Sequence, residues 1–370
     1  MITVTSKRIR VLVVDDSAFA RKVIREVLSR DAEIEVVGIA RDGLEALEKI
    51  GELKPDVVTL DLLMPELDGL GVLRALPSES APSVVIVSVS GSETELAIEA
   101  LQNGAVELVT KPTPLPTDRL YELSSDLITK VKAAAIAKTR IIKAPTGGLQ
   151  SGKLRIHSPL QISHPTTPTR FVAIGTSTGG PQALTYLFKA LPAGLPVPLA
   201  IALHIPAGYT APLAARLSQL SAVTVKEAFD GMELISGQAV IAPGGMHLGI
   251  RSDHGKLFAT VSREPIGSLH FPSIDILFES VAKHVGAGAL GVILTGMGDD
   301  GTRGSRAIRE AGGRILAESA TSCVVYGMPR SIIEAGLASD VASLDGIPEL
   351  LVDHIYRGHS PLPDYLVKYS

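Results

Sequence analysis

The chain has 370 residues, and at roughly 150 residues per domain this length indicates two domains rather than one. Its 35 basic and 39 acidic residues give a net charge of −4, which excludes the strongly basic surface typical of nucleic-acid-binding proteins. Cys323 is the only cysteine, which excludes a disulfide framework and a thiolate zinc site, and no apolar run approaches the roughly 20 residues of a membrane span. We therefore expect a soluble, cytoplasmic protein with no direct membrane insertion.

Residues 9–125 form the first predicted domain. Apolar, β-branched runs such as IRVLVV, PDVVTL and SVVIVS alternate with segments of helical period such as SAFARKVIREVLSR and ETELAIEALQNG. Apolar runs of this kind, separated by helices, are typical of a parallel sheet that is covered on both faces. The pattern predicts a doubly wound α/β domain.

Polar residues stand at the ends of these predicted strands. Asp15 and Asp16 end the first strand, Asp61 the third, Ser88 the fourth and Lys111 the fifth. The carboxyl ends of parallel strands share one edge of the sheet, so these side chains should converge there. Gathered carboxylates favour Mg²⁺, and a phosphoryl group on Asp61 would be held by that metal, by Lys111 and by Ser88.

The alternative for each of these residues alone is a structural one, because acids and hydroxyls are common at strand ends and helix caps. The whole set, in this order, argues against it. The motifs VVDDS, LDLLMPELDG, VSVS and VTKP resemble the receiver domain of response regulators, which implies a flavodoxin-like fold. One departure is Leu108, where many receivers carry an aromatic switch residue.

The receiver resemblance assigns roles to the residues at the strand ends. It implies that Asp61 is the phosphoacceptor and that Ser88 and Lys111 are the switch pair. The Mg²⁺ ligands that it implies are Asp15, Asp16, Asp61 and the Leu63 carbonyl.

Residues 126–169 are predicted to be a linker. From Ala133 to Thr169 there is no acidic residue, and seven prolines and glycines interrupt the chain, at positions 145, 147, 148, 152, 159, 165 and 168. The helical pattern SSDLITKVKAAAIAK can carry the first domain some residues into this segment.

Residues 170–350 form the second predicted domain. The run FVAIGTS reads as a buried strand and PQALTYLFKAL as the helix after it, and further strand-like runs follow in PLAIALHIP and ALGVILTGM. These strand-turn-helix repeats predict a second α/β unit with a parallel sheet and its own core. Residues 351–370 read as a C-terminal tail.

The turn after the first of these strands, GTSTGG, contains a G-x-S-x-G match centred on Ser177. A serine in such a turn is exposed at the sheet edge, and backbone N–H groups at the start of the following helix can stabilise an oxyanion. The alternative is a phosphate- or nucleotide-binding turn. The turn lacks the lysine of a P-loop and the spacing of a dinucleotide fingerprint, and this disfavours nucleotide binding.

A serine nucleophile needs a base and an acid that orients the base. His204, at the end of the run PLAIAL, is the favoured base, and His247 and His270 are its competitors. The orienting acid is expected in ILTGMGDDG, where spacing alone cannot choose between Asp299 and Asp300.

Several long motifs follow the receiver-like segment along the chain. In order, they are GTSTGG, LHIP, IAPGGMH, PSIDILFESVA, ILTGMGDDG and CVVYGMP. They resemble the chemotaxis protein-glutamate methylesterases of the CheB family. The resemblance implies that Ser177 is the nucleophile, His204 the base and Asp300, the second of the two aspartates, the orienting acid.

The same resemblance implies hydrolysis of glutamate methyl esters on chemoreceptors, with release of methanol, and deamidation of receptor glutamines. It implies no cofactor for ester hydrolysis and a CheA-like histidine kinase as phosphodonor. We expect control by domain docking: the unmodified receiver partly covers the serine site, and phosphorylation of Asp61 shifts the population towards an open or activated arrangement. The departures are Thr176, where alanine is usual, and the flanks of the base, Leu203 and Ile205. The alternative function is that of a non-catalytic, receiver-linked adaptor that binds receptors.

Overall fold

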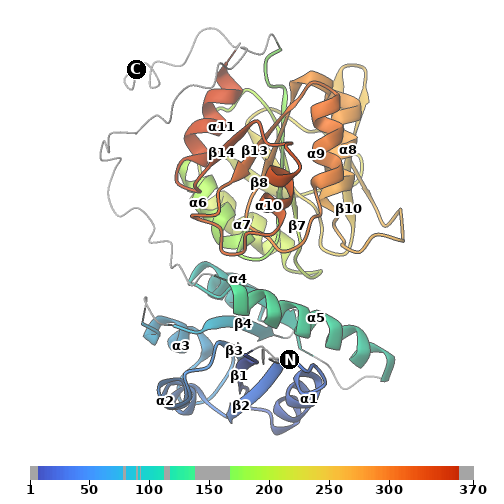
Figure 1. The fold of residues 1–370 in the computed structure, drawn as a ribbon. Coiled ribbons are helices and arrows are strands. Elements are labelled where there is room, and N and C mark those ends of the chain that lie inside the picture. The colour runs from blue at the N-terminus through green and yellow to red at the C-terminus, as the bar shows by residue number, and fades with distance from the viewer. Residues whose placement is uncertain are drawn as a thin grey trace, which may run out of the picture.

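The structure, a computed structural model, describes residues 7–77, 81–88, 91, 93–111, 117–137 and 167–357. Two α/β domains follow one another along the chain, as the sequence predicts (Figure 1). In the described part of the chain, no helix combines the length and the apolar character that crossing a bilayer requires.

The N-terminal domain is a parallel sheet of five strands in the order β2-β1-β3-β4-β5. Its inner strand β4 is buried at every position, because helices cover the sheet on both sides. Its elements are β1 (Ile9–Val14), α1 (Ala18–Leu28), β2 (Ile34–Ala40), α2 (Gly43–Leu53), β3 (Val57–Leu60), α3 (Gly69–Ala75), β4 (Ser83–Ser88), α4 (Thr94–Gln102), β5 (Glu107–Thr110) and α5 (Thr117–Ile136).

Helix α5 runs past residue 125, where the sequence reading ends the first domain. Leu127, Val131 and Ala134 recur at helical spacing and are buried in one cluster with residues of the sheet and of α1. The expected linker from 126 therefore begins, in the structure, with a helix that belongs to the N-terminal domain. Most of the remaining linker lies outside the described residues.

The C-terminal domain contains a parallel sheet of seven strands in the order β14-β13-β12-β6-β7-β9-β8 and an antiparallel hairpin. Its first elements are β6 (Phe171–Thr176), α6 (Gly180–Ala190), β7 (Leu199–Leu203), α7 (Thr210–Leu220), β8 (Thr224–Glu227), β9 (Gln238–Ile241), β10 (His247–Asp253) and β11 (Lys256–Ser262). They are followed by α8 (Ile274–Val285), the 3-10 helix η1 (Gly286–Gly288), β12 (Ala289–Ile293), α9 (Thr302–Glu310), β13 (Arg314–Glu318), α10 (Met328–Glu334), β14 (Asp340–Ala342) and α11 (Ile347–Tyr356).

Two features of this domain differ from the sequence reading. The hairpin β10-β11 stands outside the main sheet, in a part of the chain for which the sequence analysis names no strand. Helix α11 crosses the expected start of the tail at residue 351, because Leu351 and Ile355 are fully buried in the core. The described chain thus continues the domain to Arg357.

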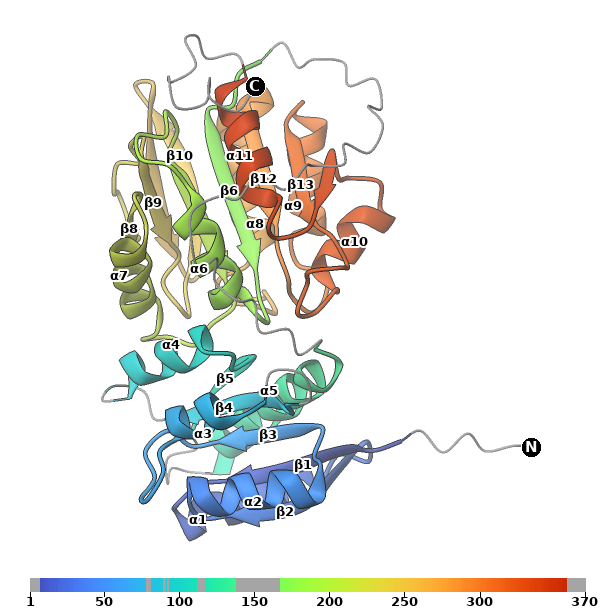
Figure 2. The same cartoon turned by 90° about the vertical axis from the view of Figure 1, so that its left-hand side faces the viewer.

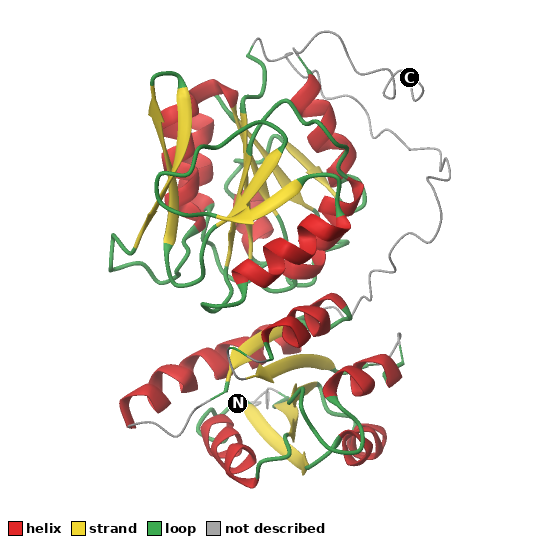
Figure 3. Ribbon diagram, turned by 180° about the vertical axis from the view of Figure 1, so that it is seen from behind, coloured by secondary structure: helices red, strands yellow, loops and turns green. Residues whose placement is uncertain are grey.

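The two domains meet at the carboxyl ends of the strands of the C-terminal sheet. Helix α4 of the N-terminal domain packs against α6 and α7 of the C-terminal domain, and β5 lies next to α4 (Figure 2). Figure 3 shows the two domains from behind. Leu101 and Leu108 on one side and Leu203 and Ile205 on the other belong to one continuous apolar cluster. This interface places the edge of one domain against the functional edge of the other.

Candidate phosphoacceptor and hydrolase sites

Three carboxylates gather at the carboxyl ends of β1 and β3. Single carboxylate oxygens of Asp15, Asp16 and Asp61 all lie within 4.8 Å of one another. Asp15 and Asp61 are buried, and the Lys111 ammonium lies 2.6 Å from Asp61 Oδ2 and 3.1 Å from Asp15 Oδ2. The structure therefore brings together four of the residues that the sequence places at the ends of different strands.

Burial is the largest cause that raises the pKa of Asp61, to about 6, and the charge of Asp15 adds to it while Lys111 opposes it. Asp61 Oδ1 is buried and accepts no hydrogen bond from a described residue. A buried carboxylate oxygen without a donor, beside two further carboxylates, suits a hard divalent cation. Leu63 lies shortly after Asp61, in the loop that leads to α3.

Ser88, the last residue of β4, is engaged with the start of α4 in this structure. Its hydroxyl donates to Glu93 Oε2 at 2.8 Å, and both residues are buried. Beside them lies Tyr209 of the C-terminal domain, a fully buried residue that the sequence analysis did not single out. Burial raises the pKa of Tyr209, the Ser88 hydroxyl lowers it and the charge of Glu93 raises it. The buried Tyr209 hydroxyl has no hydrogen-bond partner among the described residues.

Ser177 lies in a tight turn between β6 and α6. Its N–H donates to the Thr295 carbonyl at 3.0 Å, its carbonyl accepts from the Gly180 N–H at 2.7 Å, and Gly179 takes a positive φ of 77° to begin the helix. Gly296 approaches so closely that a Cβ there would lie 2.8 Å from Ser177 Cβ. These glycines let the chain fold tightly around the serine.

His204 follows β7 and hydrogen-bonds to Asp300, its Nε2 lying 2.8 Å from Asp300 Oδ2. The start of α8 also holds this carboxylate, through the N–H groups of Ile274 and Asp275 and the Ser273 hydroxyl. Burial alone would raise the pKa of Asp300, but the His204 side chain and the two N–H groups outweigh it and lower the pKa below its usual range. Asp300 is therefore a carboxylate.

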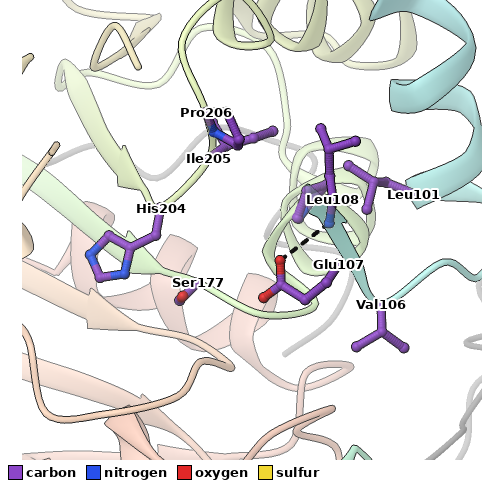
Figure 4. Close-up of a pocket in the computed structure, with 9 residues that line it drawn as sticks. Leu101, Val106, Glu107, Leu108, Ser177, His204, Ile205 and Pro206 are labelled. Atoms are coloured by element: carbon purple, nitrogen blue, oxygen red, sulfur yellow. Dashed lines mark hydrogen bonds between the residues drawn. The ribbon is translucent and has the colours of Figure 1, made fainter. Parts of the chain in front are cut away.

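A carboxylate only accepts hydrogen bonds, so the proton between the two side chains belongs to His204 Nε2. The other ring nitrogen, Nδ1, is then left with a lone pair, as a general base requires. Ser177 and His204 line the same pocket (Figure 4). The Ser177 hydroxyl itself donates to no residue in the described part of the chain.

The other candidates for the base and the acid occupy different roles. His247 is buried, and its Nδ1 accepts from the Ser273 N–H at 3.1 Å while its Nε2 lies 3.4 Å from the Pro265 carbonyl. His270 stacks on His204 with ring centroids 4.1 Å apart, a contact that its sequence position did not suggest. Asp299 is exposed, and it is Asp300 that contacts His204.

The N-terminal domain contributes part of the pocket wall. Leu101, Val106, Glu107 and Leu108 line it together with Ser177 and His204 (Figure 4). The Glu107 carboxyl group accepts a hydrogen bond from the hydroxyl of Thr178, the residue after the serine. Nothing in the local sequence around Glu107 indicates this contact, because it arises only when the two domains pack together.

Comparisons with known proteins cover almost the whole chain. Residues 11–122 match the family model of the response regulator receiver domain, and residues 172–351 match that of CheB methylesterase. A protein-glutamate methylesterase/protein-glutamine glutaminase of Myxococcus xanthus is 55% identical over 94% of this chain and 98% of its own length.

A protein of the same name from Lawsonia intracellularis is 42% identical over 94% of this chain and 99% of its own length. Among solved structures, the Thermotoga maritima CheB methylesterase catalytic domain is 40% identical, with a TM-score of 0.49. The match covers 50% of this chain and 99% of the Thermotoga maritima domain.

Proposed function

The chain belongs to the CheB methylesterase family, and we infer from this that it hydrolyses glutamate methyl esters on methyl-accepting chemotaxis receptors, releases methanol and also deamidates receptor glutamines. The observation that supports this most directly is the hydrogen bond between His204 Nε2 and Asp300 Oδ2, at 2.8 Å. It orients an imidazole that lines the same pocket as Ser177. The reaction is proposed to run in the cytoplasm, the compartment that a chain with one buried cysteine favours.

In the proposed reaction, Ser177 Oγ attacks the ester carbonyl and His204 Nδ1 takes the hydroxyl proton. Asp300 holds Nε2 in its protonated form and stabilises the imidazolium that results. The tetrahedral intermediate expels methanol, which receives the proton from His204, and leaves a glutamyl ester of Ser177. Water activated by His204 then hydrolyses this acyl-enzyme and restores the serine.

The first domain is proposed to control the second through phosphorylation of Asp61 by a CheA-like histidine kinase. The acidic cluster fits a divalent cation, which we take to be Mg²⁺ bound by Asp15, Asp16, Asp61 and the Leu63 carbonyl. Such an ion would neutralise charge on the incoming phosphoryl group. Lys111 supplies a fixed positive charge beside Asp61, and Ser88 is the hydroxyl that would turn towards the phosphoryl oxygens.

The decisive experiment measures methanol release from methylated receptor membranes, with and without acetyl phosphate as phosphodonor. Release should require Ser177 and increase with the phosphodonor, and chelation of divalent cations should abolish that increase while sparing the basal rate. The variant Ser177→Ala should lose esterase turnover and keep phosphorylation of Asp61. Undiminished methanol release by this variant would contradict the assignment.

The adaptor alternative predicts no hydrolysis at all. The contact between His204 and Asp300, with His204 and Ser177 lining one pocket, argues against it. A serine-directed covalent probe separates the two readings, because an adaptor should not react selectively at Ser177.

A further inference from the structure

A glutamate side chain of the receiver lies in the hydrolase pocket. Glu107, the first residue of β5, lines the pocket that also contains Ser177 and His204 (Figure 4). Its Oε1 accepts a hydrogen bond from the Thr178 hydroxyl at 2.5 Å. The receiver thus brings a carboxyl group to the residue directly after the nucleophile.

The same edge of the receiver offers a second acceptor to this turn. The carbonyl of Val106 accepts a hydrogen bond from the Gly179 N–H at 3.3 Å, and Gly179 begins α6. Donors at a turn of this kind are the groups that bind the oxygen atoms of a substrate carbonyl. Val106 and Glu107 therefore occupy two donors that stand beside Ser177.

The burial of Glu107 is costly if it serves only as an interface contact. Its side chain is almost fully buried, and burial raises the pKa of Glu107, with the positive charge of Lys130 opposing the shift. Lys130 nevertheless directs its ammonium to the Leu108 carbonyl, at 2.7 Å, and to Asp126, at 3.1 Å. Among the described residues Glu107 forms no ion pair, and besides Thr178 its carboxyl accepts only from the Leu108 N–H, at 3.3 Å. The charged form of the carboxyl is therefore disfavoured at this position.

A carboxyl at this position is explained if the pocket is built to receive one. A glutamate side chain carries its γ-carboxyl two methylene groups from the backbone, and the proposed substrate and product have the same skeleton. We propose that Glu107 occupies the subsite of the receptor's glutamyl side chain as an intramolecular analogue of the product, and that the Thr178 hydroxyl binds the substrate there once the receiver leaves. This inference rests on the proposed function.

The proposal differs from plain steric blockage by an interface in the role that it gives to Thr178. An occupant that is tethered to the enzyme competes with the substrate, so it raises the apparent KM of the unphosphorylated protein and leaves kcat unchanged. A hydroxyl that binds substrate, by contrast, sets the KM of the open, phosphorylated enzyme as well. Substitution of Thr178 should therefore change KM in both states of the enzyme, and substitution of Glu107 only in the closed, unphosphorylated state.

The test uses the full chain and methylated receptor membranes, with kcat and KM measured from methanol release with and without acetyl phosphate. Without the phosphodonor, Glu107→Ala should lower the apparent KM towards that of the phosphorylated wild type at unchanged kcat. With the phosphodonor, Thr178→Val should raise KM roughly three- to ten-fold, the effect of one lost hydrogen bond, and Thr178→Ser should restore it. Labelling of Ser177 by a serine-directed probe verifies that each variant keeps its active-site fold.

The matched control is Gln102→Ala. Gln102 makes hydrogen bonds to Thr185 and Arg216 across the same domain interface, and it does not line the pocket. If Gln102→Ala lowers the unphosphorylated KM as much as Glu107→Ala does, Glu107 is merely an interface contact and the proposal fails.

The proposal also fails if Thr178→Val leaves the KM of the phosphorylated enzyme unchanged. Either failure leaves the proposed function intact, because methanol is still released. Wild-type protein that releases no methanol would instead overturn the proposed function and this inference together.

Discussion

Asp300 illustrates how the fold selects one of two adjacent acids. It accepts from His204 and from three groups at the start of α8, whereas Asp299 is exposed. In the variant Asp300→Asn, the amide would present N–H donors to neighbours that are themselves donors, and His204 would lose the partner that fixes its tautomer. We expect kcat of the phosphorylated enzyme to fall by about three to four orders of magnitude, as in related triads.

The measurement is methanol release at saturating substrate, and Asp299→Asn is the matched control. This control should stay close to wild type because its side chain reaches solvent. Equal losses in the two variants would mean that the His204–Asp300 contact does not orient the base.

A pH dependence follows from Glu107. Burial raises the pKa of its carboxyl in the closed arrangement, whereas in an open arrangement the exposed carboxyl would return to its ordinary value. Closure therefore takes up a proton: its stabilising effect is complete below the ordinary glutamate pKa and is lost as the pH rises through the raised one. Opening should therefore become easier as the pH rises from the ordinary pKa of glutamate through the raised pKa of Glu107. The ratio of unphosphorylated to phosphorylated activity should increase with pH over this range.

Taking this ratio removes pH effects on the hydrolysis step itself, because both states of the enzyme share that step. Methanol release is measured across the window with and without acetyl phosphate, and Glu107→Gln serves as the control because its amide does not titrate. A ratio that is flat in the wild type, or that rises equally in Glu107→Gln, would rule out this carboxyl as the source.

At the scale of helices and strands, α4 and α7 connect the two sites. Ser88 bonds to Glu93 just before α4, and Tyr209 lies beside both of them at the beginning of α7, in the segment that follows His204. A Ser88 hydroxyl that turns to a phosphoryl group must leave this contact. Leu108 stands where many receivers carry an aromatic residue, and in this structure Tyr209 of the other domain brings an aromatic ring near Ser88.

The variant Tyr209→Phe tests this connection, because it keeps the ring and removes the hydroxyl. We expect the stimulation of methanol release by acetyl phosphate to fall about five-fold, the effect of roughly 1 kcal/mol of lost coupling, while Asp61 is still phosphorylated. Tyr186→Phe, on the neighbouring helix α6, is the control and should leave the stimulation unchanged. An undiminished stimulation in Tyr209→Phe would exclude its hydroxyl from the coupling.

The strands and the residues that end them could be predicted because the signal is local. Each apolar run and the polar residue that follows it, such as Asp61 or His204, are adjacent in the sequence, and parallel strands bring such ends to one edge. The length of α5 could be predicted only in part. Its apolar residues recur at helical spacing, but the linker-like composition that begins within the helix makes its end hard to place. The hairpin β10-β11 gave no comparable signal.

Contacts between domains could not be predicted in this way. The hydrogen bond from Thr178 to Glu107 joins residues far apart in the sequence, and it exists only because two independently folded edges meet. The same holds for the position of Tyr209 beside Ser88. Sequence motifs assign residues within each domain, whereas the relation between the two sites needs the packed structure.

For the whole molecule, the interface is the element that phosphorylation must change. It combines apolar contacts, in which Leu101 and Leu108 share a cluster with Leu203 and Ile205, with a small number of hydrogen bonds around the Ser177 turn. Interfaces of this mixed kind between domains of one chain can open without unfolding either domain. The proposed control by phosphorylation requires the packed arrangement seen here to be one state of an equilibrium.

Deletion of residues 1–168 should therefore raise methanol release above that of the unphosphorylated full chain and make it independent of acetyl phosphate. The reason is that the deletion removes Val106 and Glu107 from the pocket while leaving Ser177, His204 and Asp300 in one domain. The deletion also exposes Ile205 and Tyr209, so a loss of thermal stability is expected and should be measured beside activity.

The truncated Ser177→Ala protein supplies the background rate. If the truncated enzyme stays folded and keeps its reactive serine but releases no methanol, the receiver must be an activator that completes the site, and the covering role inferred for Glu107 would be wrong.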